Sequence, residues 1–204
     1  MTRLLLATRN RHKVREIAAI LAAAGAPVEL IGLDGYPAAP DVEETGKTLE
    51  ANALLKAHSG VTYTGLAAAA DDTGLFVDAL GGAPGVKSAR YSGPEATYEA
   101  NNRKLLAALA GVPAEKRTAR FISVVALAAP GAVPVVFKGE LAGRIIELPR
   151  GANGFGYDPL FVPDGSRLTL AEMSAAEKNR FSHRQRAFGQ LAEFLKAAAR
   201  SPGV

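Results

Sequence analysis

The chain contains 204 residues, of which 48% are hydrophobic, so it is long enough to bury a sizeable core as one domain or as two closely joined lobes. It has no cysteine, which excludes disulfides, thiolate zinc sites and cysteine nucleophiles. The formal net charge of +4 favours an anionic partner, but dispersed charges and 6% aromatic residues are unlike a polynucleotide-binding surface, so a small phosphorylated ligand fits better.

The first third of the chain predicts strands that alternate with helices. Residues 3–7, with an apolar run at residues 4–7, are typical of a buried strand, and apolar residues after Lys13 recur at helical spacing. Residues 28–33 predict a second strand, and residues 48–58 predict a helix capped by a threonine. The alanines of residues 66–70 favour a helix, but the flanking glycines leave room only for a short element, so we expect a strand there.

The rest of the chain predicts a hairpin between two helices. The first of these helices begins at Pro94 and continues through residue 109, and the last follows Ser182. The expected strands cover residues 121–129, 133–141, 145–148 and 160–162. Pro130 and Gly131 separate the first two of these strands, which is a strong hairpin signal. Together these elements imply an α/β fold whose sheet is partly antiparallel.

The connection between the first strand and the first helix is a candidate anion site. Its residues are Thr8, Arg9, Asn10, Arg11, His12 and Lys13. N–H groups at a helix start, the helix dipole and several basic side chains can bind an anion such as a triphosphate. An ordinary cap by Asn10 or Thr8, followed by solvated basic residues, explains the same pattern equally well.

Two pairs of acids are candidates for a metal site. Asp71 and Asp72 end a predicted buried strand, so we expect one acid to be functional and the other to be held behind it by hydrogen bonds. Acid pairs are also common turn formers. Glu43 and Glu44 are most simply a solvated pair, but Mg²⁺ at a triphosphate commonly uses one or two protein carboxylates, and these acids could supply the second.

The glycine-rich segment of residues 151–159 is a candidate for binding a flat ligand. It carries two aromatic rings among three glycines, so its backbone could approach a ligand closely while the ring of Phe155 stacks on it. For Phe155 taken alone, core packing is the simpler explanation.

The polar segment of residues 174–184 is the last candidate. Ser182 begins a capping box, which places His183 and Arg184 in the first turn of the last helix, where cations oppose the helix dipole. That small cost favours another role for them. Together with Lys178 they could contact carbonyl oxygens of a base, or phosphate.

Taken together, these segments resemble the family of noncanonical purine nucleoside-triphosphate pyrophosphatases, the inosine triphosphatase or Ham1-like proteins. The motifs that carry the resemblance are T-x-N-x-x-K, E-E-T-G, A-D-D-[ST]-G-L, G-G-x-P-G, N-G-F-G-Y-D-P-x-F and S-x-x-E-K-N-x-x-S-H-R. No single motif is specific, but six in this order from residue 8 to residue 184 are.

The resemblance implies a role for each candidate residue. Asp72 would be the general base and a metal contact, with Glu44, or less favourably Glu43, as the second metal carboxylate. Lys13 would be the main phosphate cation. The residues expected to bind substrate are Thr8, Arg9, Asn10, Arg11, His12, Lys13, Thr73, Phe155, Gly156, Tyr157, Asp158, Lys178, His183 and Arg184. Arg9 and Thr73 depart from the residues that are more frequent at these positions, a small residue and a serine.

The resemblance also implies an elongated mixed sheet flanked by helices, with two lobes around a central cleft in a single domain of residues 1–204. It implies hydrolysis of ITP, dITP or XTP to the monophosphate and pyrophosphate, with Mg²⁺ as cofactor, by a homodimer. No segment has the roughly 20 apolar residues of a membrane helix, and the apolar run at residues 4–7 is too short for a signal peptide, so we expect a soluble, cytoplasmic protein.

Two other functions remain open at this point. A related pyrophosphatase could act on pyrimidine or modified nucleotides. A nucleic-acid-binding protein would explain the basic charge, but the acid pairs would repel phosphate unless a metal intervened, so we expect neither a nucleic acid nor a membrane as partner.

Overall fold

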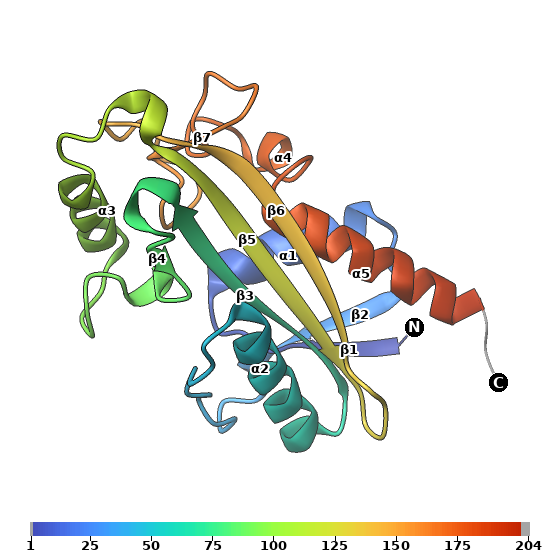
Figure 1. The fold of residues 1–204 in the computed structure, drawn as a ribbon. Helices are drawn as coiled ribbons and strands as arrows, with labels where there is room; N and C mark the ends of the chain where they lie inside the picture. The colour runs from blue at the N-terminus through green and yellow to red at the C-terminus, as the bar shows by residue number, and fades with distance from the viewer. Residues whose placement is uncertain (1, 201–204) are drawn as a thin grey trace. The chain divides into compact units, whose positions relative to one another are not determined.

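A computed structural model describes residues 2–200 and contains a sheet flanked by helices (Figure 1). The strands are β1 (Thr2–Leu6), β2 (Val28–Gly32), β3 (Ala67–Val77), β4 (Pro84–Gly85), β5 (Thr118–Ala128), β6 (Val135–Ile145) and β7 (Phe161–Pro163). The α-helices are α1 (Arg11–Ala23), α2 (Leu49–Thr64), α3 (Tyr98–Ala108), α4 (Ala175–Lys178) and α5 (His183–Arg200). Within residues 2–200, no helix combines the length and apolar character of a bilayer-crossing segment.

The strands of the described chain form one mixed sheet. Their order is β2-β1-β3-β5-β6-β7, and β4 pairs with β3 outside this path. β1 runs parallel to both β2 and β3, whereas β4 is antiparallel to β3 and β7 is antiparallel to β6. Parallel neighbours need long crossover connections, here α1 and α2, and antiparallel neighbours need only short ones. The predicted α/β fold with a partly antiparallel sheet is therefore confirmed.

The described residues divide into two compact units. Unit 1 comprises residues 2–72, Ser123–Gly139 and residues 184–200, and unit 2 comprises Thr73–Ile122 and Glu140–His183. Strands β3, β5 and β6 each contribute residues to both units.

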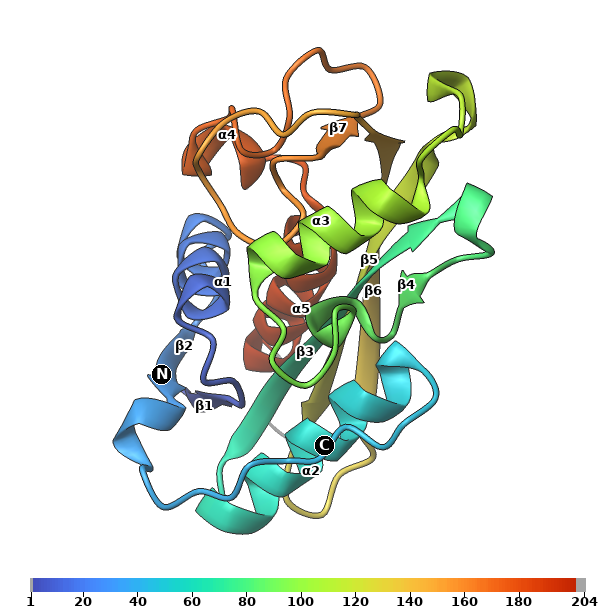
Figure 2. The same cartoon turned by 90° about the vertical axis from the view of Figure 1, so that its left-hand side faces the viewer.

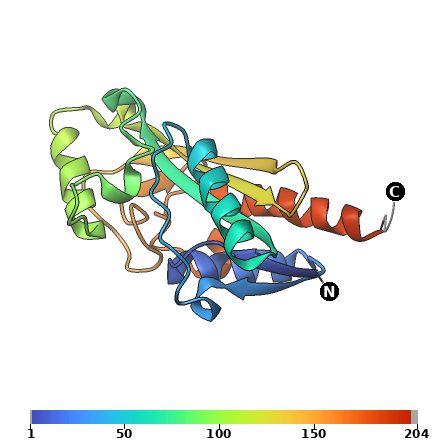
Figure 3. The ribbon, with the colours of Figure 1, turned by 90° about the horizontal axis from the view of Figure 1, so that it is seen from below.

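The core of unit 1 forms on both faces of β1. Leu4, Leu5 and Leu6 are at most 1% exposed. Leu4 and Leu6 pack in a cluster with residues of α1 and α5, including Ile17 and Phe188. Leu5, which points the other way, lies beside α2. Side chains alternate along a strand, so an unbroken apolar run requires helices on both faces, and Figures 2 and 3 show α1 and α2 on opposite sides of the β1–β2 pair.

Helix α2 is longer than its sequence predicts. The predicted cap is confirmed, since the hydroxyl of Thr48 accepts a hydrogen bond from the N–H of Ala51, but the helix ends at Thr64 instead of near residue 58. A Cβ on Gly60 would lie 2.9 Å from the Leu5 side chain, so this glycine allows α2 to approach the sheet and does not end the helix. Gly65, at φ +68°, ends it.

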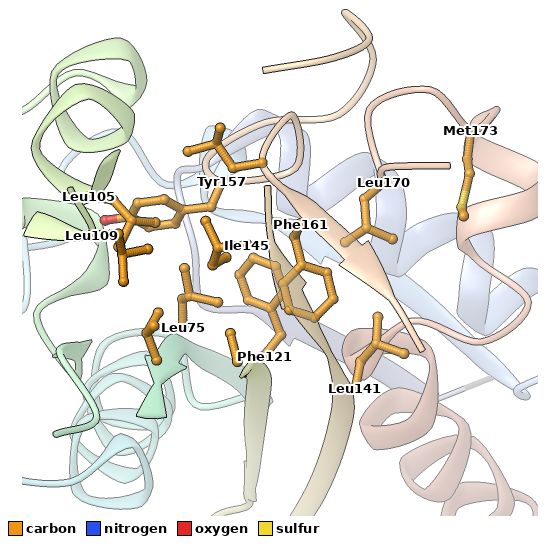
Figure 4. Packing of buried hydrophobic residues seen from close by; sticks show 13 residues of the cluster. Leu75, Leu105, Leu109, Phe121, Leu141, Ile145, Tyr157, Phe161, Leu170 and Met173 are labelled. Atoms are coloured by element: carbon orange, nitrogen blue, oxygen red, sulfur yellow. The ribbon is translucent and has the colours of Figure 1, made fainter. Parts of the chain in front are cut away.

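The core of unit 2 lies around β5 and β7 (Figure 4). The rings of Phe121 and Phe161 are tilted by 55° relative to each other, with centroids 4.8 Å apart. Leu105 of α3 and Leu109, the residue that follows this helix, are fully buried in the same cluster. The hydroxyl of Tyr157 donates a hydrogen bond to the carbonyl of Ser88 at 2.9 Å, so the polar atom of this buried side chain has a partner.

Two predicted boundaries are wrong in ways that matter for the site. β3 does not end at Asp71 and Asp72 but continues to Val77, so both acids lie inside a strand. Helix α3 begins at Tyr98, not at Pro94, because the hydroxyl of Thr97 caps it by accepting a hydrogen bond from the N–H of Ala100.

Two further differences concern the end of the sheet and the last motif. Of residues 145–148, which were expected to continue the sheet, only Ile145 lies in a strand, because it is the last residue of β6 and pairs with Phe161 of β7. A short helix, α4, was not predicted. Ser174 and Glu177 form a reciprocal capping box at its start, which is the signal that could have revealed it.

Replacing Gly143 by alanine should destabilise the protein. An added Cβ would press on the Val162 carbonyl oxygen and lie 2.7 Å from the Phe161 ring, so β6 and β7 could not stay paired at this spacing. We expect a loss of about 1–3 kcal/mol, seen as a lower urea midpoint with an unchanged slope. The control Gly35→Ala, where nothing lies within 4 Å of the new Cβ, should leave the midpoint in place. Equal stability of Gly143→Ala and the wild type would contradict the tight strand contact.

Candidate functional site

Five charged side chains of unit 1 form what we call the lysine–carboxylate cluster: Lys13, Lys56, Glu44, Asp71 and Asp72. Lys13 Nζ lies 2.8 Å from Asp71 Oδ2. Lys56 Nζ lies 2.8 Å from Glu44 Oε1 and 2.9 Å from Asp72 Oδ1. Both ammonium groups also donate to the backbone carbonyl of Asp71, at 3.3 and 2.9 Å. The strand–helix junction and the acid pair of β3 therefore meet in one place.

The two acids of β3 have different partners, as expected for neighbours on a strand. Asp71 accepts a hydrogen bond from Ser123 Oγ at 2.6 Å and lies 3.5 Å from Arg184 Nε, and its side chain is fully buried. Asp72 contacts Lys56 and accepts a hydrogen bond from Asn52 Nδ2 at 3.3 Å. Hydrogen bonds and ion pairs hold both acids, each with its own partners, and the prediction that only one of them is functional stays a prediction.

The pKa values of this region reflect burial and charge together. Burial by itself would raise the pKa of Asp71, but the cations of Lys13 and Arg184 and the hydrogen bonds from Lys13 and Ser123 hold it well below its ordinary value. Burial lowers the pKa of Lys13, Asp71 opposes this, and the cations of Lys56 and Arg184 add smaller lowering effects. Asp71 has two cations beside it, which stabilise its ionised form. Lys13 has one acid and two cations beside it, so its charged form is stabilised less.

The pKa values of Asp72 and Lys56 are raised, whereas those of Asp71 and Lys13 are lowered. Burial raises the pKa of Asp72, and Glu44 adds to this, although Lys56 acts against it. Burial lowers the pKa of Lys56, but Asp72 and Glu44 outweigh it, so the pKa of this lysine is raised. A buried carboxylate with a raised pKa is a stronger base than an ordinary aspartate.

The segment from Thr8 to Lys13 is held by its own cap. Asn10 Oδ1 accepts hydrogen bonds from the N–H groups of His12 and Lys13, and Thr8 Oγ1 accepts one from Asn10. Arg9 donates to the Ala39 carbonyl at 2.6 Å and to Asp41 at 3.1 Å.

The first turn of α1 therefore has an ordinary Asn10 cap, with Arg11 and His12 exposed. Lys13 is not a solvated cap residue, because it pairs with buried Asp71. Anion binding by this segment stays a prediction.

Arg184 lies deep in unit 1. Its side chain is 2% exposed, and its guanidinium contacts Glu16 through Nη1 and Asp71 through Nε. These contacts join the start of α5 to α1 and β3. A contact of Arg184 with a base stays a prediction.

In unit 2, Asp158 organises the glycine-rich loop. One of its oxygens, Oδ2, accepts hydrogen bonds from Lys178 Nζ at 2.6 Å and from the N–H of Phe155 at 2.9 Å. A side chain on Gly154 would strike this carboxylate, so the glycine allows the loop to fold over it. The Lys178–Asp158 pair is almost fully buried, and Lys178 Nζ also lies 5.1 Å from the centroid of the Phe155 ring.

The other predicted residues of unit 2 have distinct surroundings. The centroid of the Phe155 ring lies 5.9 Å from that of the Tyr98 ring on α3. The carbonyl of Gly156 accepts a hydrogen bond from Asn102 Nδ2 at 3.1 Å. His183 is buried and stacks on Phe121, with centroids 4.7 Å apart and planes 16° apart. Tyr157 packs in the core, and Thr73 is half-buried in β3.

The carboxylates of the lysine–carboxylate cluster fit a magnesium ion. Oxygens of Glu44 and Asp72 already converge on one positive charge, the ammonium of Lys56. Hard oxygen ligands of this kind suit Mg²⁺, which is usually held by one or two carboxylates together with substrate phosphates. No group of three or more His, Asp or Glu side chains that could hold a metal ion by themselves occurs among residues 2–200.

Four residues around the cluster escaped prediction: Glu16, Asn52, Lys56 and Ser123. Asn52 and Lys56 lie four residues apart on α2, a spacing that puts both side chains on one face of a helix. Two polar residues on the face that also carries buried Ala53 are the signal that could have found them. Nothing comparable points to Glu16 or Ser123.

Comparison with known proteins identifies the family. The model of the Ham1 family matches residues 4–194. A dITP/XTP pyrophosphatase of Geobacter sulfurreducens is 54% identical over 195 residues, which cover 96% of this chain and 97% of that protein.

Two solved structures are also similar. A HAM1 protein from Coxiella burnetii is 40% identical with a TM-score of 0.87, covering 97% of this chain and 100% of that chain. A nucleoside-triphosphatase / dITP/XTP pyrophosphatase from Mycobacterium abscessus is 47% identical with a TM-score of 0.74, covering 93% of this chain and 97% of that chain. The chain belongs to the Ham1 family, as its motifs predicted.

Replacing Asp71 by asparagine should cost stability that depends on pH. At pH 6 the variant leaves Lys13 and Arg184 without their shared buried carboxylate, so we expect a loss of about 3 kcal/mol. The lowered pKa of Asp71 means that its contribution is present above about pH 4, the ordinary pKa of an unfolded aspartate, and is lost as the pH falls below it. Urea unfolding should therefore show a smaller difference between variant and wild type at pH 3 than at pH 6.

The matched control is Asp41→Asn, an acid of unit 1 that is 93% exposed and pairs only at the surface with Arg9. It should change stability little at either pH. A wild-type advantage over Asp71→Asn that is the same at pH 3 and pH 6 would mean that the buried carboxylate is not the source of the stability.

Proposed function

We propose that the chain hydrolyses noncanonical purine nucleoside triphosphates, namely ITP, dITP and XTP, to the nucleoside monophosphate and pyrophosphate. One observation carries the proposal: Asp72 and Glu44 meet at a single cation, with Lys13 bound to the same strand. Such a set can hold a metal ion and the phosphates of a nucleotide together. The activity would remove these nucleotides from the nucleotide pool.

The names of the relatives support the reaction class. Curated relatives that are 50–54% identical over almost the whole chain are named dITP/XTP pyrophosphatases. The chain is accordingly an enzyme, a hydrolase that acts on the anhydride bonds of nucleoside triphosphates.

Asp72 and Glu44 are the residues that would hold Mg²⁺, which neutralises phosphate charge when bound. Asp72 would take a proton from the water that attacks the α phosphorus, as a general base. Burial supports this role because it raises the pKa of Asp72. The bond between the α phosphorus and the bridging oxygen to the β phosphorus breaks, and pyrophosphate leaves.

Lys13 would neutralise the negative charge that develops on the leaving pyrophosphate. Its ammonium is held in place by Asp71 and by the Asp71 carbonyl, so little reorganisation is needed. Preorganised charges of this kind lower the activation free energy by about 3 kcal/mol. The other residues of the Thr8–Lys13 segment and Thr73 would bind phosphate oxygens.

The residues of the glycine-rich loop would bind the base, with the ring of Phe155 stacking on it. Lys178, His183 and Arg184 would supply donors to the base edge. A 6-oxo purine satisfies such donors, whereas the 6-amino group of adenine would leave them unpaired at a cost of about 1–3 kcal/mol each.

We further propose that residues 1–204 act as one catalytic domain, that the enzyme is a homodimer and that it works in the cytoplasm. The first two of these proposals come from the family resemblance. We propose no nucleic-acid or membrane partner.

Product analysis tests the reaction directly. With XTP or dITP and Mg²⁺, we expect the monophosphate and pyrophosphate, measured by ion-exchange chromatography and a pyrophosphate-specific assay. ATP should be cleaved roughly tenfold or more slowly in kcat/KM, because unpaired donors oppose adenine. Release of orthophosphate and a nucleoside diphosphate, or equal rates on ATP and XTP, would refute the proposal.

Asp72→Asn tests the catalytic assignment. An asparagine cannot accept the proton of the attacking water, so kcat should fall by about 100-fold or more. The control Asp41→Asn removes an exposed carboxylate of the same unit and should keep wild-type turnover. A folded Asp72→Asn enzyme with near wild-type kcat would exclude Asp72 as the base.

A further inference from the structure

Asn52 of α2 is a buried amide that joins two separate parts of unit 1. Its side chain is inaccessible to solvent. Oδ1 accepts a hydrogen bond from the N–H of Gly46 at 2.8 Å, and Nδ2 donates to Asp72 Oδ2 at 3.3 Å. One planar group therefore connects the segment that carries Glu44 with the carboxylate of Asp72.

The contact at Gly46 leaves no spare room. A Cβ on Gly46 would lie 2.5 Å from Asn52 Oδ1 and 3.0 Å from the Asn52 backbone nitrogen. Only glycine allows the backbone to come this close, so the segment that follows Glu44 is seated directly on the amide.

The carboxylate of Asp72 is held by two donors at once. Lys56 contacts Oδ1 at 2.9 Å, and Asn52 contacts Oδ2, so the plane of the carboxylate is fixed. Glu44, two residues before Gly46, reaches the same Lys56 ammonium at 2.8 Å. Asn52 is thus the neutral link between the two acids, and Lys56 is the charged link.

We propose that Asn52 is a positioning residue that sets the placement of the Asp72 and Glu44 carboxylates for a divalent cation. The inference rests on the proposed function, because that cation would be the metal of the reaction. Asn52 itself would contact neither metal nor substrate. Removing such an outer hydrogen-bond partner typically weakens metal binding by about 10–100-fold.

Direct cation binding is the readout that separates positioning from a purely structural role. We would titrate Mn²⁺ into the full-length protein with a non-hydrolysable α,β-imido purine triphosphate and follow free Mn²⁺ by electron paramagnetic resonance. Asn52→Ala should weaken Mn²⁺ binding by about 10-fold or more. Mn²⁺ affinity within about twofold of the wild type, in a folded variant, would overturn the inference.

Asn101→Ala is the matched control. Asn101 is also a buried asparagine, 2% exposed, and it accepts the N–H of Ser92 at 2.7 Å and donates to backbone carbonyls, but it belongs to unit 2. Its loss should lower the urea midpoint without weakening Mn²⁺ binding. Equal weakening by both variants would show that general loss of stability explains the effect, and the inference would fail.

Gly46→Ala disturbs the contact between Gly46 and Asn52 without changing Asn52 itself. It tests the inference if Asn52→Ala does not fold. The new Cβ would lie 2.5 Å from Asn52 Oδ1 and 2.8 Å from Ala51 Cβ, so the segment must move away from the Asn52 amide and Mn²⁺ binding should weaken although Asn52 is present. A double-mutant cycle of Gly46→Ala and Asn52→Ala should show that their effects on Mn²⁺ binding are coupled, because both variants break the same contact. Losses that simply multiply in the double variant would contradict a shared link.

The outcomes distinguish this inference from the proposed function. If the wild type releases no pyrophosphate from XTP but Asn52→Ala still weakens Mn²⁺ binding selectively, the proposed reaction fails and the positioning role stands. If the wild type is active and Asn52→Ala binds Mn²⁺ normally, only the positioning role fails.

Discussion

The buried carboxylate of Asp71 is the interaction on which the arrangement of unit 1 depends. A charge without solvent is costly by several kcal/mol unless cations and hydrogen bonds replace the lost water. Here those partners come from three elements around β3: Lys13 on α1, Ser123 on β5 and Arg184 at the start of α5. Each of these elements must pack correctly for Asp71 to stay ionised, so the pairing of one side chain coordinates the placement of four segments.

Side chains alternate along β3, so the neighbouring acids Asp71 and Asp72 have different partners. Asp71 points to the side where cations neutralise it, and Asp72 points to the side where Lys56 and Asn52 hold it. The backbone carbonyl between them accepts hydrogen bonds from both lysines. A structural acid and a candidate catalytic acid are thereby kept at a constant separation, because they are joined by one peptide unit of a regular strand.

Local patterns predicted much of the fold but not all of its boundaries. The first strand, the cap at Thr48 and the hairpin around Pro130 follow from apolar spacing and turn residues, which act over a few positions. The predicted start of α3 at Pro94 was wrong, because Thr97 caps this helix. The predicted α2 was too short, because Gly60 packs closely against the sheet and the helix continues through it.

The sequence by itself determined the fold class, the family and the candidate acids Asp72 and Glu44, because order, spacing and residue type are properties of the chain. Only the tertiary structure decided their partners. Lys56 and Asn52 become part of the cluster because α2 packs beside β3, and Asp71 becomes a buried ion-pair centre because α1 and α5 meet there. Hydrogen bonds and charges act over a few ångströms of space, so residues distant in sequence can be matched only after the chain has folded.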